Sequence, residues 1–130
     1  MLNWVLSFLS FCLLLGGSFP NQTSPHVVTE ISVQWMQDGT ENHRVYIQPG
    51  KMNKLLLYLR SLDPVPKNEA PDPQAVPEYQ ITLQLSDGTV VRYTQLGITN
   101  FRKEDGSWQV IDPEDAIRLP LILAAVPGDS

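Results

Sequence analysis

Residues 78–96, EYQITLQLSDGTVVRYTQL, constrain the fold more than any other stretch of the chain. Every second residue from Tyr79 to Leu85 is apolar and the residues between them are polar, which is the period of a half-buried β-strand. Asp87-Gly88 then favours a turn, and a second run rich in β-branched residues follows it. The segment therefore predicts a β-hairpin with one face in a core.

The register of this hairpin follows from which residues must share its buried face. A two-residue loop would pair Leu83 with Arg92, whereas a three-residue loop that ends at Gly88 pairs Leu83 with Val91. The second register brings the apolar residues together, so we predict a type I turn with a glycine bulge. Val90 and Arg92 then share the opposite, more solvated face.

The first 18 residues, MLNWVLSFLSFCLLLGGS, differ from the rest of the chain. Val5 to Leu15 is an uncharged apolar run, shorter than the about 20 residues that a membrane-spanning helix needs. Small residues follow the run, as at the cleavage site of a secretory signal peptide, so we predict cleavage after Ser18. No Lys or Arg precedes the run, which leaves an uncleaved N-terminal membrane anchor as the alternative.

Length, cysteine content and charge exclude several classes of protein. The 130 residues allow one domain with its own core. The only cysteine, Cys12, lies in the apolar run, so the exported domain would have no disulfide and no zinc–thiolate site. The formal net charge of -5 provides no basic surface for nucleic acid. We expect contact with a membrane only if residues 1–18 are retained.

Turn and helix signals divide the remaining chain into a polar linker at 19–26, a single domain at 27–126 and a frayed tail at 127–130. The first half of the domain is expected to contain a strand at 27–36, a turn at Asp38-Gly39, a strand at 44–48 and a helix that begins at Pro49 and is stopped by Asp63-Pro64. A proline-rich loop at 63–77 then leads to the 78–96 hairpin. Strands at 99–103 and 107–111 follow, and the last element is a short helix that follows Asp112 and ends or kinks near Pro120. This order, β-β-α-β-β-β-β-α, predicts a two-layer α+β domain whose antiparallel sheet is covered by one main helix and a short C-terminal helix.

Apolar spacing also predicts which side chains face the core. The main helix carries one apolar stripe with spacings of three and four residues. Its members are Met52, Leu55, Leu56, Leu59 and Leu62. In the second strand we assign Val45 and Ile47 to the core side. Tyr46 has the opposite parity, so it is the candidate for an exposed aromatic ring at a binding surface.

The last predicted hairpin turns at Asp105-Gly106. A two-residue loop pairs Phe101 with Val110 and places Trp108 on the same face as Phe101, whereas a three-residue loop pairs Phe101 with Gln109. We predict the two-residue loop because it gathers the large apolar residues. Phe101 and Trp108 would then both pack in the core.

Residues that could carry chemistry are few. His26 lies in the linker and His43 near a strand start, without the spacing of a metal site. The acidic residues fall at turns, helix caps and loops, where they have structural roles. No recognised catalytic or nucleotide-binding motif occurs. We therefore predict no catalytic residue, no metal and no cofactor.

The order of segments resembles small exported domains of unknown function from Gram-positive bacteria. The resemblance is carried by ISVQWMQDG, KMNKLLLYLRSL, YQITLQLSDGTVVRYT and ITNFRKEDGSWQVI after a signal segment, over about residues 27–125. The proline-rich loop and the missing lipoprotein cleavage motif depart from the lipoproteins among those domains. The resemblance implies a location in the cell envelope and a binding role, and it carries over no catalytic residue.

The leading hypothesis is an extracytoplasmic, non-enzymatic binding or regulatory domain that acts on a protein or another envelope component. It requires one exposed apolar or aromatic patch, on the order of several hundred Å², on a solvated face or edge of the sheet. A small secreted hydrolase that uses a carboxylate and His43 is one alternative, and it requires a pocket that holds both groups. A structural protein anchored in the membrane by residues 1–18 is the other alternative.

Overall fold

A computed structural model describes residues 27–67, 69–72, 74–75, 77–97 and 99–129. Its antiparallel sheet has seven strands in the order β2-β1-β4-β5-β6-β7-β3. The strands are β1 (Val28–Gln37), β2 (Thr40–Tyr46), β3 (Val65–Pro66), β4 (Glu78–Leu85), β5 (Val90–Leu96), β6 (Asn100–Lys103) and β7 (Gln109–Val110). The helices are α2 (Pro49–Ser61), α3 (Pro113–Ala116) and α4 (Arg118–Ala125).

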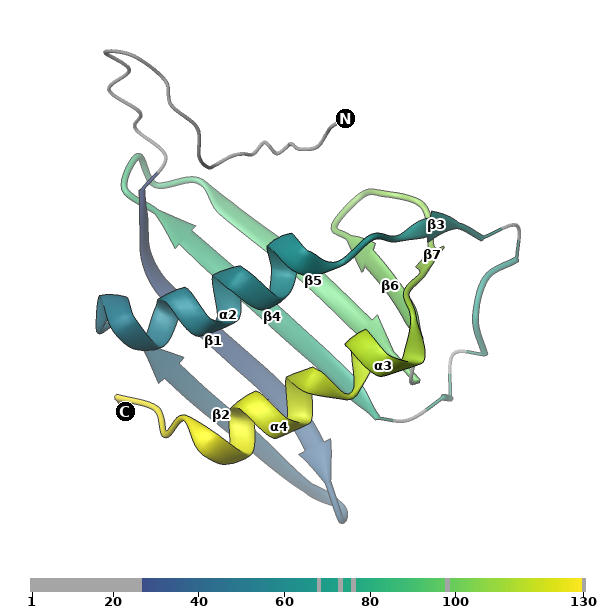
Figure 1. Cartoon of the computed structure of the whole chain (residues 1–130), viewed down its shortest axis with the longest axis horizontal. Coiled ribbons are helices and arrows are strands. Elements are labelled where there is room, and N and C mark those ends of the chain that lie inside the picture. Colours follow the sequence, from purple (N-terminus) through teal and green to yellow (C-terminus); the bar gives the residue numbers. More distant parts are fainter. Residues whose placement is uncertain (1–26, 68, 73, 76, 98, 130) are drawn as a thin grey trace.

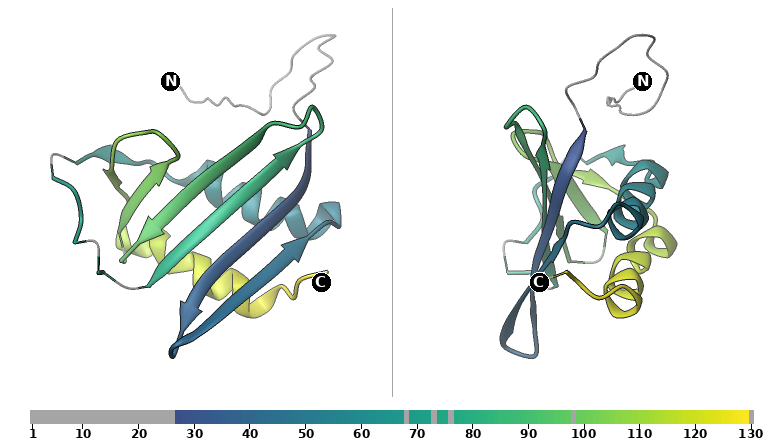
Figure 2. Two further views of the ribbon diagram at one scale, coloured as in Figure 1. Left: turned by 180° about the vertical axis from the view of Figure 1, so that it is seen from behind. Right: turned by 90° about the vertical axis from the view of Figure 1, so that its left-hand side faces the viewer.

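All described helices lie on the same face of the sheet, and the other face is left open (Figures 1 and 2). The predicted two-layer α+β architecture is confirmed. The predicted signal peptide with its cleavage site, and the linker, lie outside the described residues.

The central hairpin has the predicted register. Leu83 pairs with Val91, and Ile81 pairs with Tyr93. Gly88 has a φ of 90°, a left-handed conformation that costs glycine little, and its N–H donates to the Leu85 carbonyl over 3.0 Å. The prediction of the three-residue loop, made because it gives the hairpin one continuous apolar face, is confirmed.

The first hairpin contradicts the predicted parity of the second strand. Asp38 and Gly39 have φ angles of 52° and 76°, which is a two-residue primed turn. This turn pairs Ile31 with Tyr46, so Tyr46 shares the core face of β1. Tyr46 is fully buried and Ile47 is 52% exposed, while Val45 pairs with Ser32 on the opposite face of β1 from the buried Ile31. The assignment of Val45 and Ile47 to the core, and of Tyr46 to the surface, was therefore wrong.

The last hairpin takes the register that the sequence analysis rejected. Phe101 pairs with Gln109, and Asp105 adopts the left-handed conformation with a φ of 67°. Phe101 is buried, whereas Trp108 is half-buried with the Arg102 guanidinium 4.5 Å from its ring centroid. The prediction that Trp108 joins the core was therefore wrong. The buried Ile111 takes its place, because this register turns Ile111 inward just before α3.

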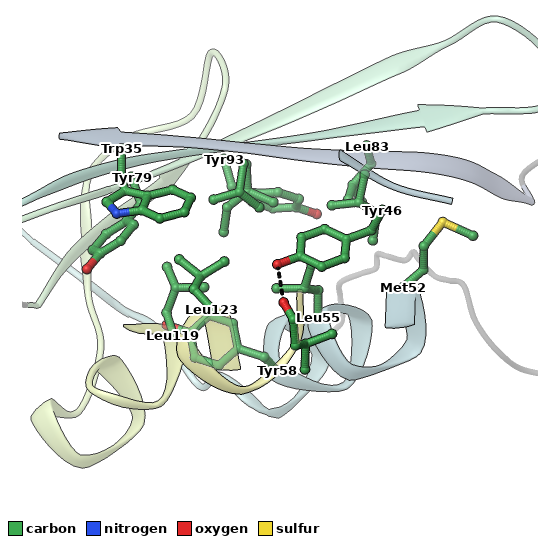
Figure 3. Close-up of a cluster of buried hydrophobic side chains, with 14 of the residues drawn as sticks. Trp35, Tyr46, Met52, Leu55, Tyr58, Tyr79, Leu83, Tyr93, Leu119 and Leu123 are labelled. Carbon is green, nitrogen blue, oxygen red and sulfur yellow. Dashed lines mark hydrogen bonds between the residues drawn. The ribbon is translucent and has the colours of Figure 1, made fainter. Parts of the chain in front are cut away.

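The core fills the space between the sheet and the helices (Figure 3). Its fully buried apolar side chains come from both layers and are Ile31, Val33, Tyr46, Leu55, Tyr58, Ile81 and Leu119. The predicted stripe of α2 faces the sheet, with Met52 and Leu55 buried and the other three leucines half-buried. Tyr58 adds an aromatic ring to that face.

The C-terminal helical region breaks earlier than predicted. Asp112 caps α3 as expected, because its carboxylate accepts the Glu114 N–H over 2.9 Å. The break falls at Ile117, and a second helix, α4, begins at Arg118. Pro120 therefore lies in the first turn of α4, where its missing N–H removes no helical hydrogen bond.

The proline-rich loop starts as part of the sheet. Val65 and Pro66 form the short edge strand β3 beside β7, and the Lys67 N–H donates to the Trp108 carbonyl over 3.1 Å. Proline is tolerated at a sheet edge because no further strand needs its missing donor. The loop returns to β4 at Pro77, whose carbonyl accepts the Gly97 N–H over 2.8 Å.

We predict that Leu55→Asp unfolds the protein, that Leu59→Asp destabilises it less, and that Lys54→Asp leaves its melting nearly unchanged. Burial of a leucine contributes about 1.5–3 kcal/mol, and an unpaired buried carboxylate adds a larger penalty. A domain has about 5–15 kcal/mol in total. Leu55 is fully buried, Leu59 half-buried and Lys54 exposed. Thermal melting of the three variants checks the order, and near-native melting of Leu55→Asp would show that α2 does not cover the core.

Candidate functional site

The structure does not support Tyr46 as an exposed binding residue. Its ring points into the core, and its hydroxyl donates to the Val126 carbonyl over 2.8 Å (Figure 3). His43 is exposed on β2, and no hydrogen bond among the described residues joins it to a carboxylate. His26 lies outside the described residues. The residues singled out by sequence therefore do not converge on one site.

A shallow groove lies between α2 and α4 in the helical layer. The two helices lie side by side over the sheet (Figure 1). The groove has a volume of about 490 Å³. It is lined by Lys54 from α2, by Arg118, Leu121, Ile122 and Ala125 from α4, and by Val126 just after α4. The four α4 residues follow the spacing of one helical ridge, so a single face of α4 lines the groove.

The side chains that line the groove are aliphatic except for two cations. Leu121 is 62% exposed although it is a large apolar side chain. On α2, Leu57 is 51% exposed and lies three residues, or about one helical turn, after Lys54. The residues that line the groove include two cations and no acid. We call this surface the α2–α4 groove.

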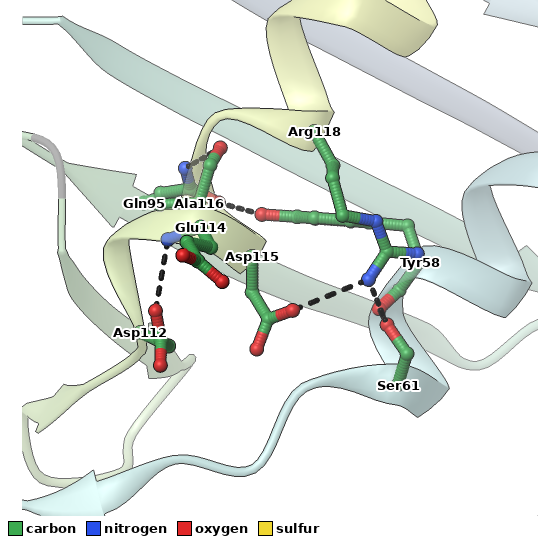
Figure 4. Close-up of polar contacts among 8 residues, drawn as sticks. All are labelled: Tyr58, Ser61, Gln95, Asp112, Glu114, Asp115, Ala116 and Arg118. Carbon is green, nitrogen blue, oxygen red and sulfur yellow. Dashed lines mark hydrogen bonds and ion pairs between the residues drawn. The ribbon is translucent and has the colours of Figure 1, made fainter.

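Arg118 joins the two helices at one end of the groove. Its guanidinium donates to Ser61 Oγ over 2.8 Å and pairs with Asp115 Oδ1 over 3.4 Å (Figure 4). The same group lies 5.5 Å from the centroid of the Tyr58 ring, within the range of a cation–π interaction. These contacts orient Arg118 and leave its side chain 40% exposed.

A series of buried hydrogen bonds lies beneath Arg118, between the helices and the sheet. The Tyr58 hydroxyl donates to Gln95 Oε1 over 2.5 Å, and Gln95 Nε2 donates to the Ala116 carbonyl over 3.2 Å (Figure 4). Burial strongly raises the pKa of the Tyr58 hydroxyl, so Tyr58 stays a neutral donor. Sheet, α2 and α3 are thereby linked beneath Arg118.

The C-terminal end of α4 is capped by two side chains of β2. The Arg44 guanidinium donates to the carbonyls of Leu123 and Val126, and the Tyr46 hydroxyl also donates to Val126. Carbonyls at a helix C-terminus lack helical partners and favour a nearby cation. The guanidinium also lies 5.3 Å from the centroid of the Trp35 ring. This cap holds the far end of the groove against the sheet.

The tail that follows α4 is fixed rather than frayed. Asp129 accepts the N–H groups of Ile47 and Gln48 over 2.6 and 2.9 Å, and its other oxygen pairs with Lys51 over 3.0 Å. These hydrogen bonds, and secondly the ammonium group of Lys51, lower the pKa of Asp129 to about 2. The predicted frayed tail was therefore wrong at Asp129, while Ser130 lies outside the described residues.

The open face of the sheet, where the sequence predicts an apolar or aromatic patch, carries mainly polar side chains among the described residues. A smaller hollow of about 180 Å³ on this side is lined by Gln34, Trp35, Met36, Glu41, Glu78 and Gln80. Glu78 accepts a hydrogen bond from Gln80 over 2.7 Å, and within the described residues no hydrogen bond joins Glu41 to Glu78 or either to His43. The described part of the chain contains no cluster of three or more His, Cys, Asp or Glu side chains that could hold a metal ion.

Comparisons of the chain with protein-family models, with curated proteins and with solved structures give no match. The resemblance to small exported domains therefore stays a prediction. Among the described helices, none is long and apolar enough to cross a membrane.

Sequence reasoning missed Lys54, Arg118 and Leu121 as site residues. The spacing of the α4 residues that line the groove is present in the sequence. A helix break near Pro120, as the sequence predicts, would place these residues in two separate segments. Lys54 was assigned to no site because only the packing of α4 beside α2 turns its surroundings into a groove. A helix start at Arg118, with Pro120 in the first turn, would have revealed the ridge.

We predict that Asp129→Asn lowers the melting temperature at neutral pH and that its difference from wild type shrinks between about pH 4 and pH 2. The pKa of Asp129 falls from 3.8 to about 2 on folding. A lowered folded-state pKa stabilises the protein above the unfolded value, and this stability is lost as the pH falls through the folded value. Thermal melts of both proteins over this range check it.

Asp63→Asn is the matched control for this pH dependence. Asp63 is exposed, and no hydrogen bond or ion pair joins its side chain to another described residue. The control removes the same charge without removing contacts, so its melting should follow wild type. A constant difference between Asp129→Asn and wild type across the whole range would contradict the assigned role of the carboxylate.

Proposed function

We propose that this chain is an extracytoplasmic, non-enzymatic domain that binds another protein through the α2–α4 groove. The observation that carries the proposal is the exposed side chain of Leu121 on α4, beside the exposed Ala125 on the same face of that helix. Full burial of such a side chain contributes about 1.5–3 kcal/mol. An exposed apolar surface with a polar rim is typical of a protein-binding site.

The chemistry of the groove supports binding rather than catalysis. Its lining offers the amine of Lys54 and the guanidinium of Arg118, and otherwise aliphatic side chains. General acid–base catalysis needs a proton donor and a proton acceptor within reach of one substrate atom. The groove lining lacks such a pair, and the carboxylates of the hollow on the sheet face have no histidine bonded to them in the described structure.

The proposed location rests on the amino-terminal sequence and on the resemblance to exported domains. Residues 1–18 combine a short apolar run with small residues before the proposed cleavage point after Ser18. The proposed regulatory role in the cell envelope follows from this location and from the proposed binding of another protein. The secreted hydrolase and the membrane-anchored structural protein remain the competing functions.

We predict that the exported protein lacks residues 1–18. The measurement is the intact mass of the protein recovered outside the cytoplasm of an expressing cell. An intact mass that matches a chain beginning at Phe19 supports export with cleavage. A full-length mass in the membrane fraction would favour the anchored alternative, and a full-length mass confined to the cytoplasm would contradict export.

We predict that a photo-crosslinking residue at position 121 captures a protein partner in the cells that produce this chain. Leu121 is exposed, so its replacement should leave the fold intact. Position 36 is the control, because Met36 is 50% exposed on the open face of the sheet. A protein joined at position 121 and not at position 36 supports the groove. Equal capture at both positions, or none at position 121, would contradict it.

A further inference from the structure

We infer that the groove receives an acidic amphipathic helix of another protein, with apolar anchors on the α4 ridge and carboxylates beside Lys54 and Arg118. This inference rests on the proposed function and specifies the chemistry of the partner. It follows from the two cations in the groove lining, from the spacing of the α4 residues that line it and from the helical structure of both walls.

The rim is a basic site on an acidic protein. The whole chain has a formal net charge of -5, yet the groove lining holds two cations and no acid. Lys54 is exposed, and its ammonium makes no hydrogen bond or ion pair with another described residue. Arg118 already pairs with Asp115, so the unmatched charge is that of Lys54. A carboxylate on a partner would supply its counter-charge, and this complementarity favours correct partners over neutral or basic ones.

Arg118 can contact a partner while it keeps its internal contacts. One terminal nitrogen of the guanidinium makes the contacts with both Ser61 and Asp115. A guanidinium has five N–H donors, so others remain for a second carboxylate. Its contacts with Ser61 and with the Tyr58 ring hold it in place before a partner binds, which reduces the entropy lost on binding.

The shape of the site favours a helix over an extended strand. The ridge from Arg118 to Ala125 covers about 10 Å, or two helical turns. A strand would need a row of free backbone donors and acceptors, whereas backbone groups in the interior of α2 and α4 are used within the helices. A helix satisfies its own backbone and presents apolar residues at spacings of three and four, which is the usual recognition in a groove between helices.

Two other occupants fit the groove less well. Residues 1–18 are apolar but contain no carboxylate, so they would leave the charge of Lys54 unmatched. A second copy of the chain would bring its own net charge of -5 against the first. Light scattering in the experiment below detects the second copy.

The test uses the purified full-length chain and three fluorescent peptides of about 15 residues, long enough for four helical turns. All carry leucines at positions i, i+3, i+4 and i+7. The first has glutamates beside the leucines, the second has lysines there, and the third is the glutamate peptide with a central proline that prevents a helix. Fluorescence anisotropy measures the dissociation constants at low and high salt.

We expect the glutamate peptide to bind about tenfold more tightly than either other peptide, with weaker binding at high salt. Lys54→Glu and Leu121→Ser should each weaken its binding about tenfold. Asn53→Glu and Ile117→Ser are the matched controls, because both positions are exposed outside the groove lining. These two variants should bind like wild type.

Each contrary result overturns the inference in a recognisable way. Equal binding of the glutamate and lysine peptides would contradict recognition by charge. Equal binding of the glutamate peptide and its proline variant would contradict recognition of a helix. No binding of any peptide, or a dimer in light scattering that Leu121→Ser dissociates, also overturns it. If position 121 still captures a protein in cells, the proposed function stands and only the partner chemistry is wrong. If that capture also fails, the proposed function fails with it.

Discussion

The turn at Asp38-Gly39 is the constraint on which the helical layer depends. Its two residues in the left-handed region set the register of β1 and β2, and this register decides which side of β2 faces the helices. Arg44 and Tyr46 point inward as a result and cap the carbonyls at the end of α4. A register shifted by one residue would turn both side chains outward and leave these carbonyls without donors.

Local patterns predicted the parts of the fold in which two strands share one clear apolar face. The 78–96 hairpin was correct because its alternation allows one register, and Asp112 was a correct cap because capping depends on nearest neighbours. The first and last hairpins failed for a different reason. In the first hairpin, the apolar Val45 and Ile47 indicated the wrong face, because the two-residue turn at Asp38-Gly39 sets the register and turns Tyr46 inward. In the last hairpin, the size of Trp108 favoured a core position, but the turn pairs Phe101 with Gln109 instead of Val110.

The candidate site was less predictable than the fold because it is made by contacts between distant segments. Lys54 and Leu121 become neighbours of one groove only when α4 packs beside α2. The contacts of Asp129 likewise join the last residues to the start of α2, across most of the domain sequence. Neither arrangement leaves a periodic signal, so only the folded structure reveals them.

The fixed tail has a consequence for how copies of the molecule can meet. The Asp129 N–H donates to the Val45 carbonyl over 2.7 Å, so the chain itself occupies an acceptor on the outer edge of β2. The opposite edge is β3, which is two residues long and contains Pro66. Open strand edges allow sheets of different molecules to join and aggregate, and a short edge with proline opposes this. With one edge partly occupied and the other blunted, sheet-to-sheet polymerisation is disfavoured even when the protein is concentrated.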